Sequence, residues 1–155
     1  MIKTNAARLL DAKGIFYELV PYEIDETDLS AKTVATKLGQ NINRIFKTLV
    51  ITGDKTGVIV AVIPGGEELD LKKAAISSGN KSVSMAAMKD ILGLTGYIRG
   101  GCSPIGMKKK YPAYFHESCL LHDYIFVSAG IRGLQIKINP KDLINITSGN
   151  ICDLV

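Results

Sequence analysis

A single lysine interrupts an otherwise apolar segment, residues 45–51, whose β-branched and aromatic residues predict a strand. Because side chains alternate across a strand, Lys47 shares one face with Leu49 and Ile51. An unpaired ammonium in the interior would cost several kcal/mol. Lys47 therefore either extends to solvent over a packed stem or meets an anion bound in a cleft.

A glycine-rich loop, residues 97–106, is the second candidate for chemistry. It contains Gly100, Gly101, Pro104 and Gly106, and backbone amides in such a loop can converge on an anion or on the oxyanion formed in ester hydrolysis. The same composition also suits an ordinary structural turn. The lysines at 108–110 follow directly and are either phosphate ligands or a solvated charge run.

Two further segments contain reactive residue types. Residues 127–136 predict a strand, a glycine turn and a second strand, so Ser128 and Arg132 contact a substrate only if the turn borders the cleft. His116, Cys119 and His122 are zinc-ligand types, but they lack the C-x-x-C and H-E-x-x-H spacings, so we expect no metal and place the histidines on a surface loop between strands. No histidine lies near Cys102 in sequence to activate it as a nucleophile.

Local patterns place these residues on elements of both kinds. Helices are expected from a cap at Thr4 to about Gly14, from Ser30 or Asp28 to Gly39, from Asp70 through Ser78, from Ser84 or Met85 to about Gly93, and from Asn139-Pro140 onward. Strands are expected at 16–22, 45–52, 58–64, 113–115, 124–128 and 134–138, the second and third joined as a hairpin. This irregular interleaving predicts a mixed α+β fold in a single domain, residues 1–155.

Composition narrows the class of protein. The chain has 155 residues, of which 46% are hydrophobic, enough for one core, and no apolar stretch approaches the length of about 20 residues that spans a membrane. The N-terminal residues lack a signal-peptide pattern and the three cysteines show no paired spacing, so we expect a cytoplasmic protein with reduced thiols. The net charge of +4 mildly favours a polyanionic partner.

Taken in order, five segments resemble the YbaK/EbsC family of freestanding aminoacyl-tRNA deacylases, close to its cysteinyl-tRNA(Pro) branch. The resemblance covers nearly the whole chain. Any one segment is weakly specific, but five in the right order are specific. The segments are residues 3–10, 46–49, 68–73, 96–106 and 127–134.

The resemblance implies a fold and a site. The family fold is a mixed β-sheet closed into an irregular barrel and surrounded by helices. It would make Lys47 the essential residue at the tRNA 3′ end, with Gly100 and Gly101 in the loop whose amides hold the aminoacyl carbonyl or the terminal adenosine. Residues implied in substrate binding are Tyr22, Thr48, Cys102, Ser103, Pro104, Ser128, Gly130 and Arg132.

The implied activity is trans-editing, the removal of cysteine from tRNA(Pro). In the cysteinyl branch the substrate thiol attacks its own ester, so the protein needs no nucleophile, no cofactor and no metal. Implied partners are the acceptor end of aminoacyl-tRNA and prolyl-tRNA synthetase. Two alternatives stay open: an Ala-tRNA(Pro) deacylase that uses water, and a non-catalytic module that binds aminoacyl-tRNA or a synthetase.

Overall fold

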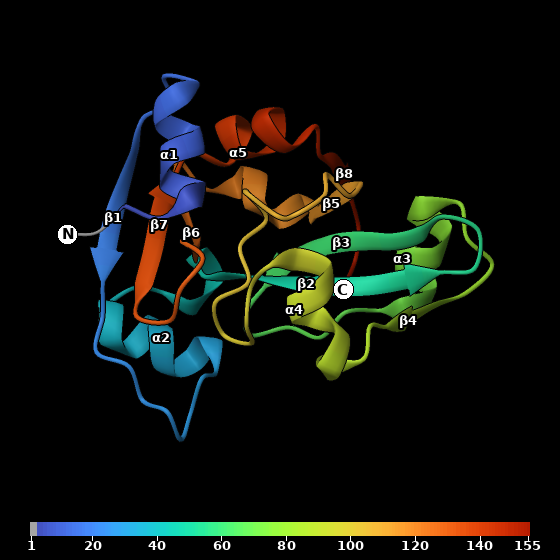
Figure 1. Cartoon of the computed structure of the whole chain (residues 1–155), viewed down its shortest axis with the longest axis horizontal. Helices are drawn as coiled ribbons and strands as arrows, with labels where there is room; N and C mark the ends of the chain where they lie inside the picture. The colour runs from blue at the N-terminus through green and yellow to red at the C-terminus, as the bar shows by residue number, and fades with distance from the viewer. Residues whose placement is uncertain (1–2) are drawn as a thin grey trace.

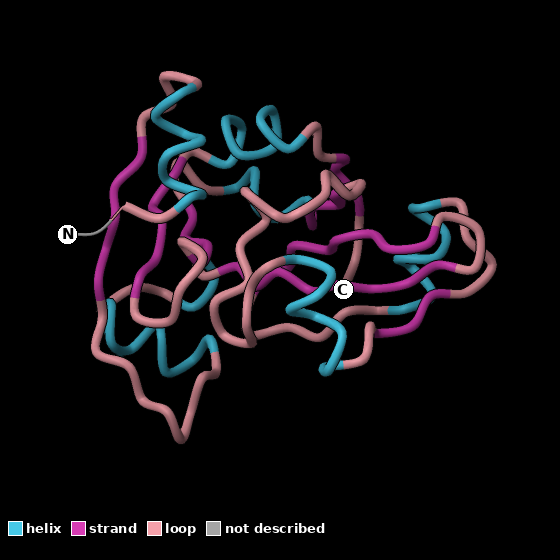
Figure 2. Tube along the Cα trace, in the orientation of Figure 1, coloured by secondary structure: helices cyan, strands magenta, loops and turns pink. Residues whose placement is uncertain are grey.

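The computed structural model describes residues 3–155, whose helices and strands are traced in Figures 1 and 2. The helices are α1 (Asn5–Ala12), α2 (Ala31–Leu38), α3 (Leu71–Ser78), α4 (Ile91–Thr95) and α5 (Pro140–Thr147), with short 3-10 helices η1 (Ile42–Arg44), η2 (Met88–Asp90) and η3 (Glu117–Leu121). The strands are β1 (Tyr17–Pro21), β2 (Phe46–Gly53), β3 (Gly57–Pro64), β4 (Val83–Met85), β5 (Ala113–His116), β6 (Ile125–Ser128), β7 (Leu134–Ile138) and β8 (Asn150–Cys152). None of the helices in this range is long and apolar enough to cross a bilayer.

Two β-sheets form the framework (Figure 1). The larger has the strand order β4-β2-β3-β5-β8 and the smaller β1-β7-β6. β2 and β3 pair antiparallel along their whole length, from Phe46 opposite Pro64 to Gly53 opposite Gly57. The predicted hairpin is therefore confirmed. β3, β5 and β8 run parallel to one another, so the larger sheet is mixed as expected.

The expectation of a sheet closed into an irregular barrel is wrong. Within residues 3–155, β1 and β6 remain edges of the smaller sheet, and β4 and β8 remain edges of the larger one. An isolated bridge between Ile45 and Phe126 links the two sheets. Because a barrel requires its edge strands to pair with each other, these sheets are joined by side-chain packing instead of a closed hydrogen-bond ladder.

A shared apolar core holds the two sheets together. Phe115 of the larger sheet and Ile136 of the smaller one belong to the same buried cluster. α1 and α5, which lie together at the top of Figure 1, contribute the fully buried Leu10 and Leu143 to it. Since each such side chain contributes about 1.5–3 kcal/mol on burial, this cluster fixes how the sheets face each other.

Helix starts follow the predicted caps. The side chains of Thr4, Ser30, Asp70 and Asn139 each accept a hydrogen bond from a first-turn amide. Such a cap contributes about 1 kcal/mol because it satisfies an amide that the helix itself leaves unpaired. Asp28, the alternative cap of α2, accepts hydrogen bonds from Thr33 and Ser30 instead, and these lower the pKa of its carboxyl group to about 2.

The predicted helix from Ser84 or Met85 to Gly93 is wrong in its first half. Val83–Met85 form β4, which pairs antiparallel with residues 51–53 at the end of β2. η2 and α4 follow, and the helix ends at Gly96, which has a positive φ of 84°. The open edge of β2 takes these residues as a strand because its backbone groups need partners, and this requirement overrides local propensity.

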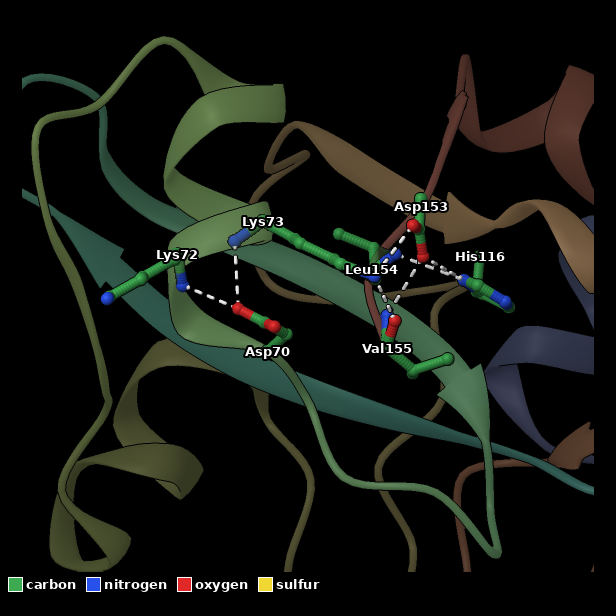
Figure 3. A network of polar contacts seen from close by, with 7 residues as sticks. All are labelled: Asp70, Lys72, Lys73, His116, Asp153, Leu154 and Val155. Atoms are coloured by element: carbon green, nitrogen blue, oxygen red, sulfur yellow. Dashed lines mark hydrogen bonds and ion pairs between the residues drawn. The ribbon is translucent and has the colours of Figure 1, made fainter.

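The last residues add a strand that no sequence pattern predicted. Asn150–Cys152 pair in parallel with β5, and Leu154 is then buried against the β2–β3 hairpin and α3. Figure 3 shows the polar contacts around this segment: Lys73 Nζ donates to Asp153 Oδ2 (2.7 Å), and His116 Nδ1 accepts from the Leu154 amide (3.0 Å). The chain end is therefore tied to both α3 and β5.

Candidate functional site

A cleft of about 550 Å³ opens where the two sheets meet, with residues of β2, β6 and β7 among its lining. The loop before α2, α2 itself, the segment from Met85 to α4 and the glycine-rich loop also contribute to the lining. Six of the predicted site residues line it: Tyr22, Lys47, Thr48, Gly100, Cys102 and Ser128. The other five lie outside the lining: Gly101, Ser103, Pro104, Gly130 and Arg132.

Lys47 is half-buried near the start of β2, opposite Ile63 of β3. On the other side of β2, β4 pairs with residues 51–53 alone, so β4 ends short of Lys47. Every ion pair found within residues 3–155 joins other residues. The Lys47 ammonium is therefore an uncommitted cation in the lining of the cleft, available to an anionic ligand.

Two other residues of the cleft lining contain buried polar atoms without partners. Thr48 Oγ1 and Gln135 Oε1 have no hydrogen-bond partner among the described residues, and both residues line the cleft. Ser128, paired with Gln135 across β6 and β7, accepts a hydrogen bond from the Gly130 amide through its hydroxyl oxygen (3.1 Å). Because buried polar groups are normally satisfied, these unpaired atoms indicate a place for a polar ligand.

Sequence reasoning missed Gln135, and the local pattern gave no signal for it. β7 reads Leu-Gln-Ile-Lys-Ile, so Gln135 alternates with apolar residues and shares a face with Lys137, as in an ordinary half-exposed strand. Its 5% exposure places it in the interior beside the cleft. The wall formed by Met85 and Met88 was also missed, because a helix was expected there.

The glycine-rich loop is held by its own hydrogen bonds and by close packing. Gly100 has a φ of +81°, which glycine adopts without strain. The Gly101 amide donates to Ile98 O (2.9 Å), and a Cβ at Gly101 would lie 3.3 Å from the Ile131 backbone. Gly101 is thus committed to a turn and to close packing. Ser103 is fully buried, and its hydroxyl accepts from the Ile105 amide (3.3 Å).

Arg132 joins two loops that border the cleft. Its Nε donates to Arg99 O (2.8 Å) and its guanidinium donates to Glu26 Oε2 (3.0 Å). Glu26 is well exposed, so this ion pair contributes at most about 1 kcal/mol. Arg132 therefore holds the acidic loop before α2 against the glycine-rich loop, instead of lining the cleft itself.

Tyr97 connects the glycine-rich loop to the turn after β6. Its hydroxyl donates to Ile105 O within the loop. A Cβ at Gly130 would lie 2.9 Å from the Tyr97 ring, and Gly130 has a φ of +106°. Burial raises the pKa of Tyr97 to about 12, so its hydroxyl keeps its proton for this bond. Gly130 thus makes room for the ring of Tyr97, a residue whose structural role no sequence pattern revealed.

Cys102 lines the cleft as a protonated thiol. Burial raises its pKa to about 11, offset in part by a hydrogen bond with Thr95. The two histidines, His116 and His122, do not belong to the cleft lining. Since a nucleophilic cysteine requires a thiolate and a nearby base, the lining offers Cys102 no activation.

The His116, Cys119 and His122 triplet does not converge on one point. His116 ends β5, Cys119 is buried within η3, and His122 follows η3. The expectation that both histidines lie on a surface loop is wrong for His116, which is 8% exposed and accepts the Leu154 amide. Among residues 3–155, no group of three or more His, Cys, Asp or Glu is placed to hold a metal ion.

Comparison with known proteins identifies relatives along the whole chain. The aminoacyl-tRNA editing domain profile matches residues 26–146. A protein of Enterococcus faecalis named as a candidate Cys-tRNA(Pro)/Cys-tRNA(Cys) deacylase, EbsC, is 50% identical over 98% of this chain and 93% of its own length.

Two further relatives connect the chain with prolyl-tRNA synthetases. The proline–tRNA ligase of Thermosipho melanesiensis is 27% identical over 79% of this chain, which corresponds to 23% of the ligase. A crystal structure described as a candidate trans-editing enzyme for prolyl-tRNA synthetase superposes with a TM-score of 0.84 and 28% identity, covering 99% of this chain and 98% of that one. With a matching profile over most of its length and a half-identical relative, this chain belongs to the aminoacyl-tRNA editing domain family.

Proposed function

We propose that this protein is a trans-editing deacylase that removes cysteine from tRNA(Pro). The observation that carries the proposal is the cleft itself, in which an uncommitted Lys47 ammonium lies in the same lining as the unsatisfied Thr48 and Gln135. Such a cleft suits an anionic ligand with a small polar group. Family membership and half-identity to a candidate Cys-tRNA(Pro)/Cys-tRNA(Cys) deacylase support an aminoacyl-tRNA as that ligand.

The reaction requires no nucleophile from the protein. The substrate cysteine thiol loses its proton and its sulfur attacks the ester carbonyl of the same residue. A carbon–sulfur bond forms, the bond from the carbonyl carbon to the ribose oxygen breaks, and that oxygen takes up a proton. The products are a cyclic thiolactone and free tRNA. This route fits a cleft whose own cysteine, Cys102, stays protonated.

The chain's residues would orient the substrate and stabilise charge. We assign Lys47 to the phosphate or ribose at the tRNA 3′ end, where a cation fixes the terminal nucleotide. The amides of Gly100 and Cys102 would face the developing oxyanion, because the Gly101 amide already donates to Ile98 O. Thr48, Ser128 and Tyr22 would surround the aminoacyl group. Orientation and oxyanion stabilisation can carry most of such an intramolecular reaction.

The proposal is tested by deacylation of radiolabelled Cys-tRNA(Pro) and Ala-tRNA(Pro). We expect wild type to release cysteine, with the thiolactone detectable by mass spectrometry. Lys47→Ala should lower the rate by roughly 100-fold or more, the usual effect of removing one group that stabilises the transition state. Lys47→Arg tests whether charge suffices, and Lys55→Ala, a lysine at the far end of the β2–β3 hairpin, is the matched control.

Each outcome separates the possible functions. Release of alanine and not cysteine would make the protein an Ala-tRNA(Pro) deacylase that uses water. Equal activity of wild type and Lys47→Ala would show that Lys47 takes no part in the reaction. Tight, salt-sensitive tRNA binding without any release would leave a binding module.

We further propose that the protein acts beside prolyl-tRNA synthetase. A net charge of +4 gives only modest attraction for RNA, and the chain matches a segment that makes up 23% of a proline–tRNA ligase. A freestanding editing protein would receive its substrate from the synthetase that attaches the wrong amino acid to the tRNA. Co-purification of tagged protein with the synthetase, strengthened by added tRNA(Pro), is the expected result. Tight tRNA binding with no recovery of synthetase would contradict it.

A further inference from the structure

A second hollow, of about 240 Å³, lies next to the cleft along the chain. Residues 104–107 line this hollow, and Arg99, Gly100 and Cys102, just before them in the chain, line the cleft. α1, the start of β5 and the end of α5 supply its other sides. Cys102 in the cleft and Pro104 in the hollow are two residues apart, a chain distance of at most about 7 Å.

The interior of the hollow is apolar. Val60, Ile105 and Ala113 are each no more than 4% exposed and belong to the shared core, while Leu9 of α1 and Ile146 of α5 form its sides. Tyr111 also lines it, and the tyrosine hydroxyl donates to Leu94 O (2.8 Å), which fixes the position of the ring. An apolar recess with a fixed aromatic ring suits a flat, weakly polar group such as a nucleobase.

The charged residues lining the hollow are all lysines. Lys13, Lys109 and Lys110 belong to its lining, which contains no Asp or Glu within residues 3–155. All three are exposed, and the ion pairs found within these residues involve none of them. Lys110 Nζ donates to Ser148 Oγ (3.2 Å), which holds one cation at the end of α5. The hollow therefore suits a ligand with an apolar group for the recess and negative charge for the three lysines.

We propose that this hollow binds an unpaired nucleotide of the tRNA acceptor end, upstream of the terminal aminoacyl nucleotide. The base occupies the apolar recess and the neighbouring phosphates meet Lys13, Lys109 and Lys110. This inference rests on the proposed function, because it assumes that the RNA whose 3′ end enters the cleft continues along the glycine-rich loop to the hollow. An acidic, apolar peptide would also match the charge of the hollow, but it would not explain why one loop lines both the cleft and the hollow.

The hollow gives the protein a recognition element that is separate from the chemistry. It holds RNA outside the cleft, so its loss weakens binding of tRNA and leaves the reaction of a shorter substrate unchanged. The test therefore compares Cys-tRNA(Pro) with 3′-cysteinyl-adenosine, which contains the terminal nucleoside alone.

Two variants probe the two halves of the proposal. Lys109→Gln with Lys110→Gln removes charge at exposed positions, and Leu9→Trp fills the recess from a residue that is 39% exposed. For Cys-tRNA(Pro) we expect kcat/KM to fall about 10-fold in each variant. In the lysine variant the slope of log kcat/KM against log salt concentration should also become shallower, by the amount expected for the loss of roughly two phosphate contacts. The control, Lys55→Gln with Lys81→Gln, removes two exposed lysines outside both hollows and should behave as wild type.

Cysteinyl-adenosine should react at the wild-type rate in all variants. An equal loss on both substrates, or no loss on tRNA, would overturn the inference. Loss in the lysine variant with no effect of Leu9→Trp would overturn insertion of a base. Normal tRNA deacylation with lost binding to prolyl-tRNA synthetase would assign the hollow to a protein instead.

If wild type releases cysteine from neither substrate, the proposed function is wrong. Binding of uncharged tRNA(Pro), followed by fluorescence anisotropy, then decides the hollow by itself. Weaker binding in both variants than in wild type and the control supports the RNA site, and equal binding overturns it.

Discussion

Two residues that line the cleft contain buried polar atoms that do not stabilise the fold. Thr48 Oγ1 and Gln135 Oε1 are buried without partners in the described chain. Leaving a buried polar atom unsatisfied costs about 1–3 kcal/mol. Ser118 Oγ is also buried without a partner but lies outside the cleft lining, so we propose a substrate role for Thr48 and Gln135 because both also line the cleft.

Replacing Gln135 should therefore favour folding and impair activity. For Gln135→Leu we expect an unfolding free energy that is unchanged or up to about 2 kcal/mol higher, because a buried unsatisfied amide is removed. The kcat/KM for Cys-tRNA(Pro) should fall about 10-fold, as expected when a buried partner of the substrate is lost. Thermal unfolding and single-turnover deacylation measure the two effects, with Gln40→Leu as a control outside the cleft. Lower stability with normal activity would show that Gln135 is structural.

The thiol of Cys102 should be unreactive at neutral pH. Burial raises its pKa from 9.0 to about 11, so its thiolate fraction at pH 8 is roughly 100-fold smaller than that of an unperturbed thiol. We expect iodoacetamide to label Cys102 about 100-fold more slowly in folded protein than in guanidinium, as followed by peptide mass spectrometry. Fast labelling of the folded protein would contradict this assignment.

The same pKa shift has a consequence for stability. The unfolded chain loses the Cys102 proton near pH 9 and the folded chain near pH 11, so the folded state binds more protons between these values. Stability from this group is fully present below pH 9 and is lost as pH rises towards 11.

At the scale of elements, Tyr97 links the glycine-rich loop to the β6–β7 turn. The Tyr97 hydroxyl donates a hydrogen bond to Ile105 O in the loop, and the Tyr97 ring packs against Gly130 in the turn. Arg132, in the β6–β7 turn, donates hydrogen bonds to Arg99 O of the glycine-rich loop and to Glu26 of the acidic loop before α2, and so connects these loops. The cleft is therefore shaped by three loops that hold one another in place.

Gly130→Ala tests this assembly. The added Cβ would approach the Tyr97 ring to 2.9 Å at a φ of +106°, so we expect a loss of about 2–4 kcal/mol in unfolding free energy. Gly14→Ala is the matched control, since Gly14 has a φ of +66° with no atom within 4 Å of its Cβ position and should lose only about 1 kcal/mol. Urea unfolding measures both. Equal losses would mean that contact with Tyr97 contributes nothing.

At the scale of the whole molecule, two sheets share one core without closing into a barrel. Phe115 and Ile136 lie in one cluster, whereas the β2–β3 hairpin and α3 enclose a second cluster that includes Leu154. The cleft forms where the sheets meet, so its shape depends on the core that joins them.

This shared core predicts one cooperative unfolding transition. The chain has six tyrosines and no tryptophan, so tyrosine fluorescence and far-UV circular dichroism report on side chains and backbone separately. We expect both signals to change at the same urea concentration, as is usual for a single domain of about this size. Two separated transitions would contradict the prediction that residues 1–155 form a single domain.

The sequence by itself determined the features that depend on near neighbours. The caps at Thr4, Ser30, Asp70 and Asn139 and the hairpin of β2 and β3 were predicted because each involves contacts within a few residues. The anomaly of Lys47 in an apolar strand was also visible, since alternation along a strand is local. The glycine-rich loop was recognised from its composition.

The tertiary structure alone decided what depends on distant partners. Arg132 bonds to Glu26 across 106 residues, and no pattern near Arg132 could show that it joins loops instead of lining the cleft. Residues 83–85 became a strand because the edge of β2 was free, and Gln135 entered the cleft because β7 pairs with both β1 and β6. Closure of a sheet likewise depends on which edges meet. Local sequence specifies elements, whereas burial and long-range pairing determine which side chains share a site.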